Sequence, residues 1–502
     1  MTGFPTDKVS TDYRKLLAMD VMGYVPVKII PGVSGLLTII VLTRSLTPDQ
    51  YGVYAVVMAT VLLLVQLAGT WLSNAVLFAY PDYFDSAGVE FKSLAVKLQI
   101  RAALPATLLA FLVVTTLYRQ PFLGFLASGI VGFQLFHFLL MTFLQSERRV
   151  SGQALSVAIQ GTLQILVLLF LVSFLDYGIW AGLTAVLSGF IGGLLVLAMV
   201  SGPIWRTAPG GGRPDEKEHS RALLSYGVPM CVWYFTWSFI NVGDRILLKA
   251  LGAPESLGQY AAFRDLFTGL AGFLTMPVLL ASHPLIMMMW KREVERSEIE
   301  DLMTQNVDLL AFIFVPILVL FDLCGKELAG AVLGAGYALE NGVMLAVIGS
   351  IFLGALAMYA QKGLEVTGQT ARMTRIAVLI AAVSLGANML VIPTFAVGGA
   401  ASVVLVAQAL YLLAVRWATR GILSPTISRS AVITLAVWVV GVEALVRSLA
   451  VFFGSGGIHG MSLSLRLGIV LGLSVFLFLR FNPPFLELYS AFSSVVFRTH
   501  DE

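Results

Sequence analysis

The chain has 502 residues, of which 58% are hydrophobic and only 12% are charged, and its formal net charge is +3. Because a soluble globular domain carries roughly 25% charged residues, this composition excludes a soluble protein, and so small a net charge gives no sign of nucleic-acid binding. The charged residues are bunched between apolar runs long enough to span a hydrocarbon core. We therefore expect an all-α polytopic membrane protein.

Fourteen apolar runs predict about 14 transmembrane helices. In chain order they cover residues 22–43, 51–79, 97–117, 121–144, 152–175, 178–200, 222–243, 258–290, 303–323, 341–361, 373–392, 396–416, 430–451 and 462–481. The run 258–290 is longer than one straight crossing needs. We expect it to tilt, or to leave the membrane before its last residues.

Lysine and arginine gather on one side of these predicted spans. With the N-terminus placed in the cytoplasm, 23 of the 32 basic residues fall in cytoplasmic segments. The opposite side, called the outer side below, holds six: Arg44, Arg119, Arg245, Lys249, Lys326 and Arg447. This bias predicts that both termini are cytoplasmic. Residues 1–20 are polar and mixed in charge, so we expect no cleavable signal peptide.

An octapeptide of the pattern P-[DE]-x-x-G-x-Y-A occurs twice, as PDQYGVYA at residues 48–55 and as PESLGQYA at residues 254–261. Each copy follows a basic residue at the outer end of one span and leads into the next span. Six spans separate the copies, which predicts two parallel six-helix lobes followed by two C-terminal helices. Each repeated position of the pattern has a structural use. The proline favours a tight turn, the acid lies near a helix N-terminus, the glycine permits close helix approach, and the tyrosine suits the headgroup level.

The predicted domain boundaries follow from this repeat. They are an N-terminal lobe over 1–203, a cytoplasmic linker over 204–221, a C-terminal lobe over 222–420, two further helices over 421–482 and a cytoplasmic tail over 483–502. The linker is rich in glycine and proline, which is typical of a flexible connection. A hinge between lobes and an ordinary loop fit it equally well.

The sequence holds no motif of a known catalytic or cofactor site. It lacks a Walker A loop, an H-E-x-x-H helix, a G-x-S-x-G elbow and an Asp-x-Asp pattern. Cys231 and Cys324 lie in apolar runs, where buried free thiols are expected. His137 and His283 also lie in apolar runs, and a satisfied core histidine is favoured there over a proton relay. We therefore expect no enzyme activity, no metal and no cofactor.

Basic residues inside the spans are candidate substrate-binding groups, because a charge within a membrane is costly and usually functional. Lys28, in the first span, either faces a cavity or snorkels to the interface. Arg264, in span 258–290, either contacts phosphate with its bidentate guanidinium or pairs with a carboxylate of a neighbouring helix. Arg101, at the inner end of span 97–117, either lines a vestibule or faces headgroups. The predicted cationic cavity is formed by Lys28, Arg101 and Arg264.

Acidic residues near the spans are candidates for gating or ion coupling. Asp244 and Arg245 close span 222–243 at its outer end as a candidate gate pair, and Asp265 lies beside Arg264. Asp308, a few residues into span 303–323, is a candidate coupling-ion carboxylate.

Two further charged positions near the C-terminus have structural interpretations. Glu443 and Arg447 are four residues apart, so on a helix they can neutralise each other. Arg466 lies near the start of the last span, where we expect it to snorkel.

Four segments carry a family resemblance. LTRSLTPDQYGVYAVV follows the first span, NVGDRILLKALGAPESLGQYAAFRDL covers residues 241–266, and GLEVTGQTARMTR precedes NMLVIPTFAVGGAAS at residues 388–402. In this order, and with fourteen spans, they resemble the polysaccharide transporter family, the Wzx-type lipid-linked oligosaccharide flippases of the MOP superfamily. The likeness covers about residues 15–480.

The resemblance implies a MATE-like fold with a cationic central cavity. Such proteins move polyprenyl-diphosphate-linked oligosaccharide units from the cytoplasmic to the periplasmic leaflet by alternating access, for exopolysaccharide or lipopolysaccharide O-antigen synthesis. The implied location is the bacterial inner membrane. The implied partners are the lipid-linked oligosaccharide, membrane lipids, a polysaccharide polymerase and glycosyltransferases. Lys28 and Arg264 occupy places where the family commonly has cavity bases, whereas span 51–79 holds no basic residue.

Two other functions remain open at this point. A small-molecule exporter of the related MATE type shares the twelve-helix core, but such exporters tend to have acidic membrane sites, and the candidate residues here are mixed with bases slightly ahead. A membrane-bound glycosyltransferase or polymerase is disfavoured by the short outer loops and by the missing catalytic motifs.

Overall fold

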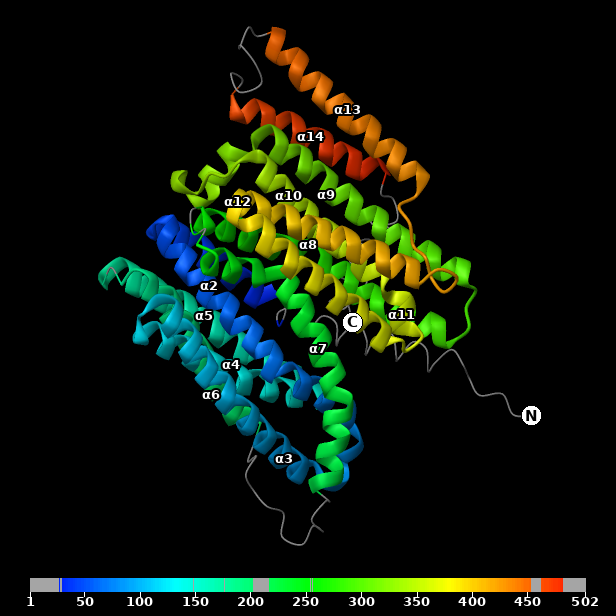
Figure 1. Cartoon of the computed structure of the whole chain (residues 1–502). Coiled ribbons are helices and arrows are strands. Elements are labelled where there is room, and N and C mark those ends of the chain that lie inside the picture. The colour runs from blue at the N-terminus through cyan, green and yellow to red at the C-terminus, as the bar shows by residue number, and fades with distance from the viewer. Residues whose placement is uncertain are drawn as a thin grey trace, which may run out of the picture. The chain divides into compact units, whose positions relative to one another are not determined.

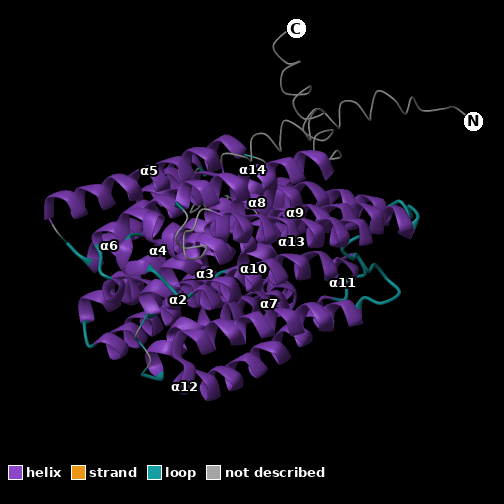
Figure 2. Cartoon of the chain, turned by 90° about the horizontal axis from the view of Figure 1, so that it is seen from above, coloured by secondary structure: helices purple, strands orange, loops and turns teal. Residues whose placement is uncertain are grey.

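The regular structure of this protein is helical. The computed structural model describes residues 27, 29–147, 149–175, 177–201, 216–252, 254, 256–452 and 462–481. Within these ranges every regular element is an α-helix, apart from a short 3-10 helix at Ala335–Tyr337 (Figure 2). The all-α class expected from composition is confirmed.

The helices lie close to the predicted spans (Figure 1). The first described helix covers Ile29–Ser45. The others are α2 (Pro48–Ala68), α3 (Thr70–Tyr118), α4 (Pro121–Ser146), α5 (Val150–Leu175), α6 (Ile179–Val200), α7 (Glu216–Ala250), α8 (Leu257–Lys291), α9 (Arg296–Leu333), α10 (Asn341–Ala360), α11 (Lys362–Val366), α12 (Thr370–Ala418), α13 (Arg429–Phe452) and α14 (Leu463–Phe481). In the described part of the chain, nine helices are long and apolar enough to cross a membrane.

The ranges of α3 and α12 each hold two helical arms. Gln99 Nε2 donates a 3.5 Å hydrogen bond to the carbonyl oxygen of Ala68, although a straight helix would put these residues about 45 Å apart. The chain therefore reverses within α3, and its second arm includes the membrane-length segment Gly88–Tyr118. In α12 the helical geometry breaks at Ala396, where φ is 46° and ψ is −127°. The two arms of α12 match the predicted spans 373–392 and 396–416, and the second arm of α3 matches the span 97–117. The predicted span 51–79 instead covers α2 and the first residues of α3.

The start of α2 is set by its local sequence. Thr47 is the N-cap, and its hydroxyl accepts a hydrogen bond from the Gln50 backbone nitrogen at 3.4 Å. The Gln50 side chain accepts one from the Thr47 backbone nitrogen at 3.1 Å, which completes a capping box. Pro48 takes the first helical position, where its missing N–H costs nothing, and Asp49 follows in the first turn. The first octapeptide is thus a helix start.

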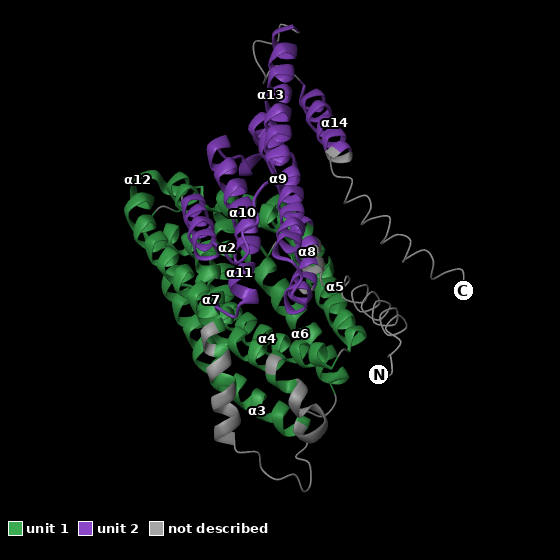
Figure 3. Ribbon diagram, turned by 90° about the vertical axis from the view of Figure 1, so that its right-hand side faces the viewer, with its two compact units in different colours: residues 1–273, 370–403 green, residues 274–369, 404–502 purple. Residues whose placement is uncertain are grey.

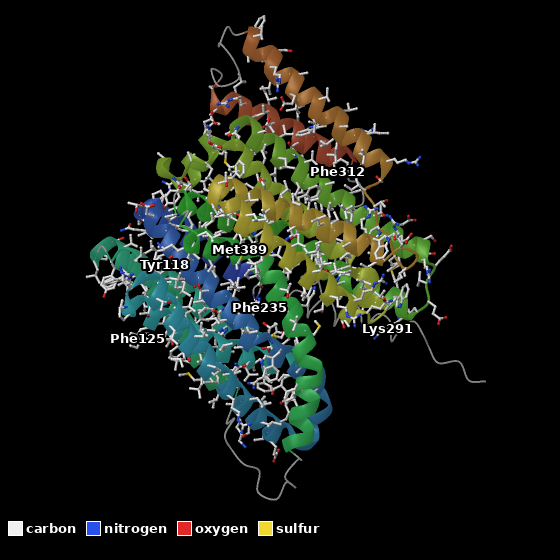
Figure 4. All side chains as sticks on the ribbon, viewed as in Figure 1. Tyr118, Phe125, Phe235, Lys291, Phe312 and Met389 are labelled. Atoms are coloured by element: carbon white, nitrogen blue, oxygen red, sulfur yellow. The ribbon has the colours of Figure 1, made fainter. Side chains whose placement is uncertain are left out.

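Large apolar side chains cover the outside of many helices. Phe125 on α4 exposes 65% of its surface (Figure 4), and Met199 on α6 and Leu390 on α12 each expose 80%. Apolar exposure on this scale is unusual for a soluble monomer and suits contact with lipid chains. Composition, helix length and exposure together identify a multi-pass membrane protein.

The chain divides into two compact units (Figure 3). Unit 1 comprises residues 1–273 and 370–403, and unit 2 comprises residues 274–369 and 404–502. One boundary falls inside α8, between Phe273 and Leu274. These units describe compactness rather than sequence repetition, so the lobes at 1–203 and 222–420 stay a prediction.

Each unit has its own apolar core. In unit 1, α3 packs on α4 around Leu72, Leu139 and Phe143, all of them buried. In unit 2, α9 packs on α13 and α14 through a second buried cluster that includes Val446 and Val470.

Arg466 is buried, so the expectation that it snorkels is wrong. It is 2% exposed, and its guanidinium donates to the Leu323 carbonyl oxygen at 2.6 Å and to the Glu327 carboxylate at 2.7 Å. Both partners lie on α9, and they make the burial of this cation tolerable. The expected pair of Glu443 and Arg447 on α13 is confirmed, at 3.0 Å.

Several predicted segments fall outside the described residues. They are the N-terminal residues 1–20, most of the linker (204–215) and the tail at 483–502.

Cys231 and Cys324 are both buried free thiols, as expected.

Candidate functional site

The two octapeptides contact each other within unit 1. A Cβ atom at Gly52 of α2 would come within 3.3 Å of the backbone nitrogen of Gly258, at the start of α8. A Cβ atom at Gly258 would overlap the carbonyl oxygen of Pro48. Because only glycine has no Cβ atom, the repeated glycine allows the outer ends of α2 and α8 to meet backbone to backbone.

Two ion pairs join α7 to α8 within two turns of this contact. Arg264 of α8 pairs with Asp244 of α7, and Arg245 Nη2 lies 2.6 Å from Asp265 Oδ1. The Arg264, Asp244 and Arg245 side chains are 3%, 1% and 5% exposed, whereas Asp265 is 24% exposed. Each cation has its own carboxylate, so the four side chains carry no net charge. This balance is what allows them to be buried within a membrane span.

Two tyrosine hydroxyls complete the cluster. Tyr51 of α2 donates to Asp265 Oδ2 at 3.0 Å, and Tyr260 of α8 donates to Asp244. Arg264 Nη1 in turn donates to the Tyr260 hydroxyl at 2.7 Å. We call the six residues Tyr51, Asp244, Arg245, Tyr260, Arg264 and Asp265 the outer network. It ties α2, α7 and α8 together (Figure 1) at the end that the charge pattern predicts to be outer.

The octapeptide tyrosines do not lie at an exposed interface. Tyr260 is 0% exposed and Tyr54 is 7% exposed. Both rings are therefore buried in the protein, and their expected depth at the headgroup level of a membrane stays a prediction. Tyr260 is buried because its hydroxyl has a carboxylate partner on α7, which satisfies the polar group away from water.

A cation–π contact lies near the outer network at the end of α7. Lys249 Nζ lies 5.1 Å from the ring centroid of Tyr118, the last residue of α3 (Figure 4). This contact holds α7 to α3 within unit 1, and it gives a second reason for α7 to stay in place when the ion pairs are altered.

The structure brings four of the predicted site residues together. Asp244, Arg245, Arg264 and Asp265 all belong to the outer network. Of the two interpretations of Arg264, this conformation has the carboxylate-paired one. Arg245 keeps one donor free, because its buried Nε has no hydrogen-bond partner in the described part of the chain.

The other predicted residues lie elsewhere. Lys28 is outside the described residues, and Arg101 is exposed on α3. Asp308 lies in unit 2, where its Oδ1 accepts a 2.8 Å hydrogen bond from the backbone nitrogen of Ser428. That contact fixes the segment just before α13. Within the described residues, no group of three or more histidine, cysteine or acidic side chains is placed to hold a metal ion.

The first helix packs directly on α8. A Cβ atom at Gly32 would come within 2.8 Å of Phe273 Cζ, and one at Gly269 within 2.7 Å of Leu36 Cδ2. The first helix and α8, whose predicted spans carry the candidate cavity residues Lys28 and Arg264, therefore touch at this level in this conformation.

Comparison with known protein families assigns the chain to one of them. Residues 20–290 match the family described as "Polysaccharide biosynthesis protein", and this range is more than half of the chain. The chain belongs to the polysaccharide biosynthesis protein family. The range matched in this family includes α2 and α7 and nearly all of α8, so it contains the whole outer network.

Solved structures with the same fold come from the MOP superfamily. One is described as lipid II flippase MurJ in an inward closed conformation, with a TM-score of 0.68 and 11% identity over 96% of this chain and 100% of that one. An inward-facing MATE-family multidrug resistance transporter has a TM-score of 0.57 and 14% identity over 78% and 94%. The Vibrio cholerae MATE transporter VcmN in a bent form has a TM-score of 0.51 and 15% identity over 80% and 97%. No match was found among curated protein sequences.

These likenesses confirm the fold of this polysaccharide biosynthesis protein. The expected MATE-like, MOP-type helical architecture is the one that the solved neighbours share. At such low identity the neighbours carry no information about substrate.

Tyr51 and Tyr260 are the network residues that the sequence did not reveal as site residues, and Tyr51 carried the weaker signal. In the aligned octapeptides its counterpart is Leu257, so a comparison of the two copies makes the position look variable. The available signal is a tyrosine at the fourth residue of a membrane helix, one position before the glycine that meets α8. Its partner could be found only once α2 and α8 were known to touch.

Proposed function

We propose that this protein is a flippase that moves polyprenyl-diphosphate-linked oligosaccharide units across the bacterial inner membrane by alternating access. Membership of a polysaccharide biosynthesis family and the MOP-type fold support a lipid-linked flippase or transporter. The observation that carries the proposal furthest is the outer network, because it combines two buried cations with a closure between the two octapeptides.

The charges of the outer network suit a diphosphate. A diphosphate headgroup cannot cross hydrocarbon without cations to replace its hydration. Arg264 and Arg245 supply planar donor sets that match phosphate oxygens, and in this conformation Asp244 and Asp265 occupy those donors. We propose that the diphosphate takes the place of one or both carboxylates when the cavity holds substrate. Lys28 and Arg101 remain proposed further cations of the same cavity.

The contact between α2 and α8 suits the outer gate of such a cycle. Release on the outer side requires the Gly52–Gly258 contact to open and the Tyr51–Asp265 hydrogen bond to break. A diphosphate that draws Arg245 away from Asp265 would weaken the same end of the network. Binding of the substrate would then favour opening of the α2–α8 contact. Directional transport needs this order, in which the outer gate opens after the substrate has bound.

The remaining details of the proposal come from the sequence. Two parallel lobes at 1–203 and 222–420 would move against each other, with both termini in the cytoplasm. The exported unit would serve exopolysaccharide or O-antigen synthesis, with glycosyltransferases supplying it and a polymerase consuming it. A MATE-type exporter of cations is the second candidate. It is disfavoured because both acidic side chains of the outer network already pair with arginines.

Proteoliposomes test the proposal directly. A polyprenyl-diphosphate oligosaccharide with a fluorescent sugar is placed in both leaflets, and a membrane-impermeant quencher is added outside. The protein should make the protected inner pool quenchable. Rapid ethidium efflux with no movement of the lipid-linked sugar would identify the MATE-type exporter instead.

Matched variants distinguish a direct role of the Arg264 cation from a general loss of protein stability. Arg264→Gln combined with Asp244→Asn keeps the pair neutral and should fold, yet lose most of the flipping rate. Arg447→Gln removes a cation that is 69% exposed on α13 and should retain it. Equal flipping by both variants would show that Arg264 does not handle substrate.

A further inference from the structure

A second polar cluster lies in unit 2, and the outer network does not include it. His283 of α8 meets Lys362 and Glu365 of α11. Lys362 Nζ lies 2.7 Å from His283 Nδ1 and 2.6 Å from Glu365 Oε2. The Lys362 side chain is only 4% exposed, so these contacts take the place of water around its ammonium.

The contact with Lys362 fixes the protonation state of His283. An ammonium group has three donors and no acceptor, so His283 Nδ1 must accept this hydrogen bond. The ring is therefore neutral in this conformation and carries its proton on Nε2. With Lys362 positive and Glu365 negative, the three side chains have no net charge.

A proton on Nδ1 would be incompatible with this arrangement. Two cationic donors would face each other across 2.7 Å, with no lone pair left between them. A carboxylate acceptor for a protonated His283 is close by, because Glu365 Oε2 lies 3.7 Å from Nδ1. The protonated ring would then compete with Lys362 for that carboxylate.

A change at Glu365 reaches other helices through hydrogen bonds. Gln361 Nε2 donates to Glu365 Oε1 at 2.8 Å, and the Tyr411 hydroxyl of α12 donates to Gln361 Oε1 at 3.0 Å. On the other side, Ser282 of α8 is bonded to the Tyr359 hydroxyl of α10 at 3.2 Å. The ionisable groups around His283 are thus Lys362 and Glu365 from α11, Tyr359 from α10 and, through Gln361, Tyr411 from α12.

The exposure of the three side chains favours a proton over a larger ligand. His283 is 44% exposed and Glu365 19%, whereas Lys362 is almost fully covered. Two of the three Lys362 donors already serve His283 and Glu365, and the ammonium is covered, so a phosphate would have to displace these side chains to reach it. A proton needs only the accessible ring of His283.

We propose that His283 is a proton-binding site that fastens α8 to α11 through Lys362 when it is neutral and releases that contact when it is protonated. One proton from solvent binds Nδ1, and Lys362 moves away from the ring while Glu365 turns toward it. Because α8 also carries Arg264, this site would couple proton binding to the helix that carries the proposed substrate cation. The coupling rests on the proposed flippase function, whereas the proton site itself does not.

Nuclear magnetic resonance of histidine-labelled protein tests the site without transport. His283→Asn, which keeps an acceptor near the Nδ1 position but cannot gain the proton, identifies the His283 signals by their loss. In the full-length protein His283 should show an unprotonated Nδ1 at neutral pH and gain a proton there as pH falls. Lys362→Met should remove the preference for the Nε2-protonated form. A ring that keeps one protonation state between about pH 5 and 8 would overturn the proposal.

The pH profile of flipping tests the coupling. Wild-type transport should change by up to about tenfold per pH unit on one side of the His283 titration, and His283→Asn should flip with a flat profile. His137→Gln is the matched control, because His137 is a core histidine of unit 1 whose Nε2 lies 3.1 Å from Ser156 Oγ. A wild-type profile in His283→Asn would overturn the coupling. Absence of flipping by every protein at every pH would instead contradict the proposed function, and the resonance experiment would still decide the proton site.

Discussion

Tyr51 of α2 and Asp265 of α8 are joined by a 3.0 Å hydrogen bond, and each residue lies in or beside one copy of the repeated octapeptide. The bond connects the first copy to the helix that follows the second copy. Gly52 and Gly258 bring the same two helix ends into backbone contact. The repeated octapeptide therefore has two uses. It starts a helix, and it brings α2 and α8 into contact at their predicted outer ends.

Removal of the Tyr51 hydroxyl should loosen that contact. Tyr51→Phe keeps the ring but loses a hydrogen bond to a carboxylate, an interaction worth about 1.5–3 kcal/mol. A loss of that size raises the population in which the α2–α8 contact is open by roughly tenfold or more. Amide hydrogen exchange over residues 48–58 and 257–267 should become faster. Tyr54→Phe is the control, because the Tyr54 hydroxyl makes no hydrogen bond in the described part of the chain. Equal exchange in both variants would show that the Tyr51–Asp265 hydrogen bond does not hold α2 to α8.

Gly258→Ala should separate the outer ends of α2 and α8. The new Cβ atom would overlap the Pro48 carbonyl oxygen, which belongs to backbone and cannot rotate away. Overpacking of this kind costs about 1–3 kcal/mol. Thermal unfolding in detergent should therefore occur at lower temperature, or the purified protein should favour an outward-open form.

Gly272→Ala is the matched control on the same helix. A Cβ atom at Gly272 meets nothing within 4 Å, so this variant should be neutral or slightly stabilising. If both alanine variants behave alike, the repeated glycine is not needed for a close contact.

Much of this fold follows from the sequence, because helix length and apolar run length are set by the same membrane thickness. The two arms of α12 match two predicted spans even though they form one continuous range, whereas the predicted span 51–79 runs through α2 into the start of α3. Side-chain partners between helices are another matter, since they depend on how each helix is rotated and how deep it sits. Arg466 illustrates this: its position near a span end indicates snorkelling, but a carboxylate on α9 lies within 2.7 Å. Tyr51 escaped notice for the same reason.

Removing one charge of an ion pair in the outer network should lower stability severely. Removing both charges of the pair together should lower it only mildly. Asp244→Asn leaves the Arg264 cation buried without its carboxylate, which costs about 3–5 kcal/mol. Asp244→Asn with Arg264→Gln removes both charges and should recover much of the stability. The comparison variant Glu443→Gln breaks an exposed pair on α13 and should cost at most about 1 kcal/mol. Chemical or thermal unfolding of these variants beside wild type checks the order, and a double variant no more stable than Asp244→Asn would show that the pair is not coupled.

Asp308→Asn should leave flipping and stability close to wild type. Asp308 Oδ1 accepts a hydrogen bond from the Ser428 backbone nitrogen at 2.8 Å, and an asparagine side chain keeps an oxygen acceptor at that place. Asp308→Ala removes the acceptor, leaves that backbone nitrogen without its partner and should cost about 1–3 kcal/mol. A coupling carboxylate would give the opposite pattern, because asparagine cannot bind an ion or a proton as a carboxylate does. Flipping in proteoliposomes measured beside thermal stability distinguishes the two roles: inactive but fully stable Asp308→Asn protein would restore Asp308 as a coupling residue.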